Sequence, residues 1–98
     1  MRKRLMPAEV FPPGEFIRDE LKERGWSQGD LARIIGRPLQ VVNQIIKGKK
    51  RITPETAVEL AAAFGTSPDA WLNLETAYQL SQVGPPDPQI AKRARMVG

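Results

Sequence analysis

Apolar residues recur at helical spacing in five successive stretches of the chain, and no stretch alternates with the two-residue period of a strand. The first three stretches have their apolar positions at Phe16, Ile17 and Leu21, then Leu31, Ile34 and Ile35, then Val42, Ile45 and Ile46. Two longer stretches follow, within 58–64 and 71–80. The pattern predicts an all-α fold of five helices whose apolar stripes face one core.

Capping and stop residues divide these stretches from one another. Ser27, with Asp30 three residues later, has the spacing of a capping box. Thr53 and Ser67 are each followed by a proline, which is the typical start of a helix. Four glycines follow the apolar stretches and are expected to end the first four helices: Gly25, Gly36, Gly48 and Gly65.

The chain of 98 residues is expected to form one domain with two extensions. Residues 1–12 are basic and contain proline, which predicts a flexible N-terminal arm. Residues 13–82 hold all five predicted helices. Residues 83–98 begin with a Gly-Pro-Pro-Asp-Pro break and continue as a basic tail, for which we predict flexibility.

The composition argues against catalysis and against secretion. The sequence contains no Cys and no His, so it has neither thiol chemistry nor the commonest general base and metal ligand. No nucleophile–base pair, metal cluster or phosphate-cradling glycine loop is present, and we expect no enzyme activity, no cofactor and no metal. The basic N-terminus is not followed by an apolar run, and no run has the length of a membrane span. We therefore expect a cytoplasmic protein.

Positive charge is concentrated in the middle of the chain. Residues 31–54 contain six Lys or Arg and no Asp or Glu. This stretch includes two short predicted helices joined by a tight turn at Gly36. A helix pair of this kind in a basic segment predicts a helix-turn-helix that docks on double-stranded DNA.

The second helix of this pair carries polar side chains where the core does not need them. Gln40, Asn43 and Gln44 share one face at offsets of three and four. Amide side chains in a major groove pair bidentately with adenine, and an apolar side chain such as Leu39 packs on a thymine methyl group. The predicted base contacts are therefore Leu39, Gln40, Asn43 and Gln44.

Phosphate contacts are expected on either side of this helix. Gln28 opens the preceding helix, where its amide and the backbone N–H groups are placed to bind a phosphate. A run of basic residues follows the recognition helix, although such a run is also typical of a solvated loop. The predicted phosphate contacts are Gln28, Arg37, Lys47, Lys49, Lys50 and Arg51.

The fifth predicted helix has more apolar surface than one core contact requires. This excess predicts a symmetric dimer, with two recognition helices about 34 Å apart on a pseudo-palindromic site. The alternative is a fuller core within one chain. The residues predicted at the dimer interface are Trp71, Leu72, Leu74, Tyr78 and Leu80.

Residues 27–65 resemble the Xre/Cro-type, lambda-repressor-like helix-turn-helix repressors, with Ser27-Gln28, Leu31-Ala32, Gly36, Val42, Ile45 and Gly48 at the matching positions. A longer span, about 12–80, resembles the HigA-type antitoxins through Pro13–Ile17, Gly48–Pro54, Gly65–Pro68 and Trp71–Leu74. The resemblance implies a dimeric antitoxin that binds a RelE/HigB-like messenger-RNA-cleaving toxin and represses its own operon. Pro38-Leu39 departs from it, because many relatives have polar residues there.

An acidic face on the first predicted helix is the candidate toxin interface, because a toxin that cuts RNA needs a basic surface. Its residues are Glu15, Asp19, Glu20 and Glu23, although they also fit a solvated helix face with a Glu20–Arg24 pair. Two other functions stay open. A stand-alone repressor would have no small basic protein encoded beside it, and an interaction module using the helices as a scaffold would not bind operator fragments.

Overall fold

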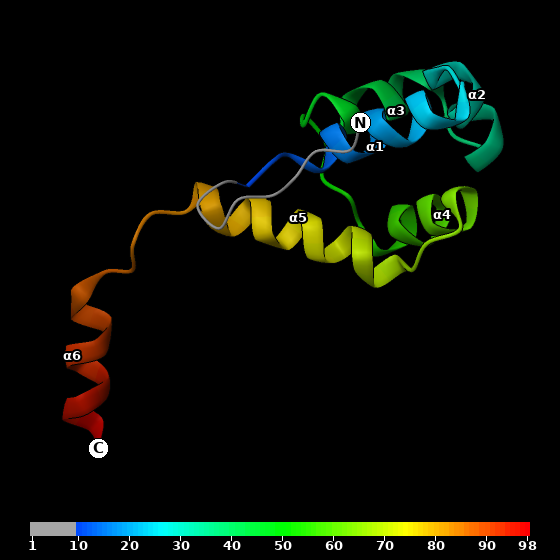
Figure 1. Ribbon diagram of the computed structural model, residues 1–98. Coiled ribbons are helices and arrows are strands. Elements are labelled where there is room, and N and C mark those ends of the chain that lie inside the picture. Colours follow the sequence, from blue (N-terminus) through cyan, green and yellow to red (C-terminus); the bar gives the residue numbers. More distant parts are fainter. Residues whose placement is uncertain (1–9) are drawn as a thin grey trace.

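The computed structural model describes residues 10–98, and this part of the chain is all helical (Figure 1). Most of the predicted arm, residues 1–9, lies outside the described residues. The described helices are α1 (Pro13–Arg24), α2 (Gln28–Ile35), α3 (Leu39–Ile46), α4 (Pro54–Phe64), α5 (Pro68–Gln82) and α6 (Pro88–Val97). No helix among residues 10–98 is both long enough and apolar enough to span a membrane.

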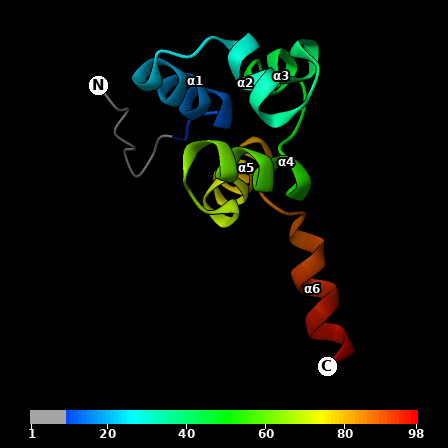
Figure 2. The ribbon, with the colours of Figure 1, turned by 90° about the vertical axis from the view of Figure 1, so that its right-hand side faces the viewer.

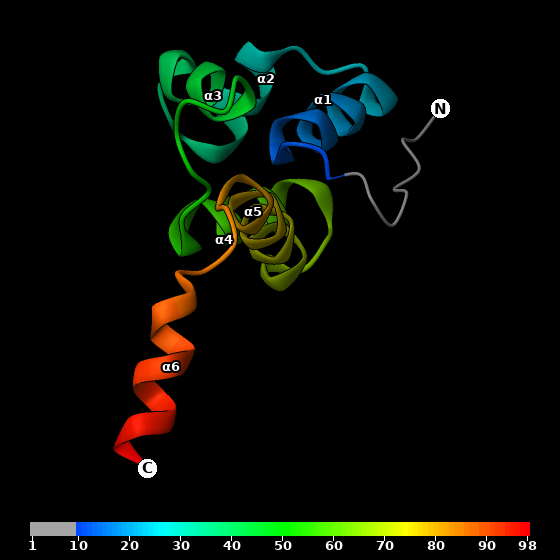
Figure 3. The ribbon, with the colours of Figure 1, turned by 90° about the vertical axis from the view of Figure 1, so that its left-hand side faces the viewer.

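Five helices form a compact body and the sixth stands apart from it. Helices α1, α2 and α3 make one layer, and α4 and α5 pack against that layer from below (Figure 1). Helix α6 extends away from the body in both side views (Figures 2 and 3). The overall extents of 56 × 27 × 22 Å reflect this projection.

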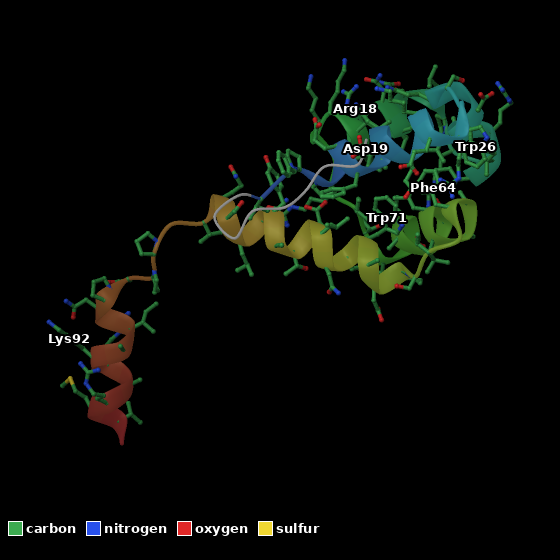
Figure 4. All side chains as sticks on the ribbon, viewed as in Figure 1. Arg18, Asp19, Trp26, Phe64, Trp71 and Lys92 are labelled. Carbon is green, nitrogen blue, oxygen red and sulfur yellow. The ribbon has the colours of Figure 1, made fainter. Side chains whose placement is uncertain are left out.

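An aromatic group closes the core between the two layers (Figure 4). The ring of Phe64 lies 5.9 Å from that of Trp26 and 5.6 Å from that of Trp71, between centroids. The Trp71 indole N–H donates to Thr66 Oγ1 at 2.8 Å, so the buried ring keeps its polar atom satisfied. Arg24 covers Trp26 and Phe64 and donates to the Phe64 carbonyl oxygen at 2.9 Å. Trp26 and Trp71 are therefore packing residues.

The predicted capping of α2 is confirmed. Ser27 Oγ accepts from the Asp30 backbone N–H, and Asp30 accepts in return from the Ser27 N–H at 2.8 Å. This second bond is the main cause of the lowered pKa of the Asp30 carboxyl. Thr53 and Ser67 cap α4 and α5 in the same way through their side-chain oxygens.

Helix α1 meets the end of α3 at a glycine. A Cβ atom built on Gly14 would lie 1.9 Å from the carbonyl oxygen of Ile46. That distance is far inside van der Waals contact, so only glycine permits this approach. The contact fixes the C-terminal end of α3 against α1, with Ile17 and Leu21 buried behind it.

Two expectations about burial are wrong. Ile34 is 49% exposed, because the buried stripe of α2 runs through Leu31 and Ala32 and places Ile34 at its outer edge. Val58 is 57% exposed, since α4 packs through Ala57, Leu60, Ala61 and Phe64 instead.

The expected number of helices is also too low, because α6 forms within the predicted tail. Asp87 accepts a hydrogen bond from the Gln89 backbone N–H, and Pro88 occupies the first turn. This is the same cap-plus-proline start that opens α4 and α5.

Candidate nucleic-acid interface

The α2–α3 pair has the form of the predicted helix-turn-helix. Gly36 adopts φ 71° at the end of α2, a conformation that glycine favours. Pro38 then stands at the start of α3 as its N-cap. Residues Val42, Ile45 and Ile46 hold α3 in the core, each at most 5% exposed.

The four predicted base-contact residues lie on the opposite side of α3. Leu39 is 53% exposed and Gln40 is exposed, whereas Asn43 and Gln44 are half-buried. An eight-residue helix with a buried apolar side and an outward polar side is the shape that fits a major groove. The fold therefore brings these side chains together on one surface.

A hydrogen bond joins one predicted base contact to one predicted phosphate contact. Asn43 Nδ2 donates to Gln28 Oε1 at 3.0 Å, across the two helices. The Nε2 donors of Gln28 and the Oδ1 acceptor of Asn43 take no part in this bond. This hydrogen bond links α3 to the start of α2. The sequence analysis did not predict it.

The basic loop after α3 is held at both of its ends. The N–H groups of Lys49 and Lys50 donate to the Gln44 carbonyl oxygen at 2.8 and 3.2 Å. Beyond the loop, the N–H of Ile52 donates to Glu75 Oε1 at 2.9 Å. The side chains between these anchors are exposed: Lys47, Lys49, Lys50 and Arg51.

Glu75 anchors the end of the basic loop, a role that the sequence analysis missed. Its side chain is buried on α5, and its second oxygen accepts from Gln79 Nε2 at 2.6 Å. A buried carboxylate needs such partners, and here one of them is the backbone of the basic loop. The signal in the sequence is its position four residues after Trp71, inside the apolar stripe of α5.

Arg37, in the turn between α2 and α3, makes a bidentate ion pair with Glu59 of α4. Its Nε and Nη2 atoms donate to the two carboxylate oxygens of Glu59 at 2.9 and 2.8 Å. The hydrogen bonds from Arg37 lower the pKa of the Glu59 carboxyl below its usual value. The pair ties the turn to α4, and Nη1 of Arg37 takes no part in it.

The acidic residues of α1 lie in different environments. Glu20 pairs with Arg24, which confirms the predicted i,i+4 ion pair. Asp19 is half-buried, and its Oδ2 atom is buried without a hydrogen-bond partner among the described residues. Glu23 is exposed, whereas Glu15 is half-buried.

The predicted dimer residues on α5 divide between core and surface. Trp71 is 3% exposed, so its ring belongs to the core of a single chain and offers almost no surface to a partner. Leu72, Leu74 and Tyr78 are half-buried, and Leu80 is 68% exposed. Leu72 and Leu80 line a groove of about 370 Å³ together with Thr76 and Val83.

Comparison with known proteins agrees with this geometry. A helix-turn-helix family model matches residues 17–71. Virulence-associated protein I of Dichelobacter nodosus is 39% identical over 79 residues, which cover 80% of this chain and 71% of the relative.

Two solved structures share the fold. An addiction module antidote protein of the HigA family from Coxiella burnetii is 37% identical, with a TM-score of 0.71 over 76% of this chain and 82% of that one. The Pseudomonas aeruginosa antitoxin HigA with the higBA promoter is 30% identical, with a TM-score of 0.72 over 91% of each chain.

Proposed function

Since this chain belongs to the Xre-like helix-turn-helix family, we propose that it is an antitoxin that represses its own operon. As a dimer it binds a palindromic operator, and it also binds and neutralises a RelE-like messenger-RNA-cleaving toxin. The observation that carries the DNA-binding role is the outward polar face of α3, bordered by the anchored loop 47–51. HigA-family antitoxins among the similar structures support the toxin-binding role.

In this proposal α3 enters the major groove. Gln40, Asn43 and Gln44 read base edges, and Leu39 packs on a thymine methyl group. The loop residues and Gln28 bind phosphates on either side, which sets the register of the helix in the groove. Because Gln28 is bonded to Asn43, a phosphate contact at α2 also orients a base-reading amide.

Gln44→Ala tests the base readout. Each protomer of the dimer loses one bidentate amide–adenine contact, which costs about 1–3 kcal/mol, so the affinity of the dimer for the operator should fall at least about 30-fold. Affinity for an unrelated duplex should stay within about twofold, because that binding depends on phosphate contacts. Fluorescence anisotropy with both duplexes measures the two effects.

Gln89→Ala is the matched control, since Gln89 lies on α6, away from α3. It should leave both affinities unchanged. Equal losses on the operator and the unrelated duplex for Gln44→Ala would contradict base readout by α3.

The acidic face of α1 is the proposed toxin interface, and Glu23→Lys is its test. Placing a like charge against a basic partner costs several kcal/mol, so the affinity for the toxin should fall at least about tenfold. Glu23 suits this test better than Asp19, because Glu23 is exposed and Asp19 is half-buried. The measurement is calorimetric titration with the small basic protein encoded beside this gene.

Asp69→Lys supplies the control, because Asp69 is an exposed acid on α5. Unchanged toxin affinity in Glu23→Lys would place the interface elsewhere. If no small basic protein is encoded beside the gene and operator binding persists, the stand-alone repressor is the better description.

A further inference from the structure

Helix α6 carries an apolar face that no other residue of the described range 10–98 covers. Ile90, Ala94 and Val97 recur at spacings of four and three residues and form one stripe, with Lys92 on the opposite side. Ile90 is 56% and Val97 is 91% exposed, and no residue of α6 is buried. A ten-residue helix is marginal in water without packing, so this stripe needs a partner surface.

A groove of matching length with an apolar side runs along α5. Leu72, Thr76, Leu80 and Val83 follow one another along that side, and the groove of about 370 Å³ is also lined by Arg51, Ile52, Glu75 and Gln79. From Leu72 to Val83 the groove is about 17 Å long, and α6 is about 15 Å long. Leu80 and Val83, at 68% and 70% exposed, leave the C-terminal end of the groove open.

The connection between α5 and α6 keeps the helix out of the groove of its own chain. The residues that flank the connection are extended, with ψ 132° at Val83 and ψ 122° at Asp87. Pro85, Pro86 and Pro88 each restrict the preceding residue to extended conformations, which opposes the tight reversal that folding back requires. Helix α6 accordingly points away from the body, and the labelled Lys92 lies far from α5 (Figure 4).

We propose that α6 exchanges between two copies of this chain, each α6 laying its Ile90–Ala94–Val97 stripe in the α5 groove of the other copy. The α5 groove and helix α6 do not meet within one chain, and a two-fold pair of chains places each α6 at the groove of the other. The exchange would form the contacts of the dimer in the proposed function. It rests on that function only in requiring that the protein form a dimer. It is consistent with the burial of Trp71 within one chain, since the exposed side of α5 then provides the interface.

Disulfide trapping tests the exchange, because the natural chain contains no cysteine. Thr76 and Ala94 lie near the middle of the two stripes, so they approach each other in either direction of docking. A mixture of Thr76→Cys and Ala94→Cys chains should form the mixed disulfide at least about tenfold faster than a mixture of Thr76→Cys and Lys92→Cys chains. Equal rates would overturn the proposal, as would a Thr76→Cys/Ala94→Cys double variant that closes its disulfide within one chain.

Light scattering with chains lacking residues 84–98 gives a second measurement. The shortened chain and Ile90→Asp should dimerise at least about tenfold more weakly, whereas Met96→Asp, off the stripe, should not. Dimerisation unchanged by the truncation overturns the exchange and leaves the operator proposal standing. Both measurements are made without DNA. If the unmodified chain forms the exchanged dimer but does not bind operator DNA, the proposed function is contradicted and the exchange is not.

Discussion

Gly14→Ala is expected to destabilise the protein by at least about 2 kcal/mol, because forced overpacking commonly costs 1–3 kcal/mol or more. The new Cβ atom would lie 1.9 Å from the Ile46 carbonyl oxygen and 2.7 Å from its carbonyl carbon. Both are backbone atoms, so no side chain can rotate away and α1 must move as a unit. The midpoint of thermal unfolding should fall by about 10 °C, given the shift of 4–8 °C per kcal/mol that is typical of domains of this size.

The same substitution should also weaken operator binding in folded protein, because Ile46 is the last residue of α3. Gly29→Ala is the control: its Cβ would find its nearest neighbour, Ser27 Oγ, at 3.6 Å, an ordinary contact within a helix. That variant should gain up to about 1 kcal/mol from helix propensity. A Gly14→Ala chain as stable as the Gly29→Ala chain would show that α1 does not rest on α3 as described.

The elements that could be predicted from the sequence are those set by local rules. Ser27, Thr53 and Ser67 cap their helices as expected, because a cap depends only on residues two or three positions away. The buried side of α3 was also predictable, since Val42, Ile45 and Ile46 are large and correctly spaced. The sixth helix was not predicted because Pro88 was read as part of a break, although a proline in that place also starts a helix.

The features that could not be predicted depend on which helices lie side by side. The bonds Asn43–Gln28, Arg37–Glu59 and Glu75–Ile52 join residues 15, 22 and 23 positions apart. No periodicity reports such pairs, because each belongs to two helices or to a helix and a loop. The prediction for Trp71 failed for the same reason. Its spacing on α5 suggests contact with a second chain, but only the packed fold shows that its ring lies against Phe64.

Operator binding should weaken about 250- to 16,000-fold between 50 and 200 mM salt. The estimate assumes that a dimer neutralises about 4–8 phosphates, which gives slopes of about −4 to −7 in a plot of log K against log salt. Exposed residues of the 47–51 loop supply this charge, and the loop is anchored at Gln44 and Glu75. A salt-insensitive complex would contradict the mode of binding proposed for α3 and its loop.

Lys49→Ala separates the contribution of this loop from that of the overall charge. One lost phosphate contact per protomer should flatten the slope of the dimer by about 2 and weaken operator and unrelated duplexes alike. Lys92→Ala removes the same charge from α6, on the side chain that Figure 4 shows far from α3, and should leave the slope unchanged. Gln44→Ala should lower operator affinity at an unchanged slope, since an amide releases no counterion. Equal flattening by Lys49→Ala and Lys92→Ala would mean that net charge, and not the anchored loop, attracts the DNA.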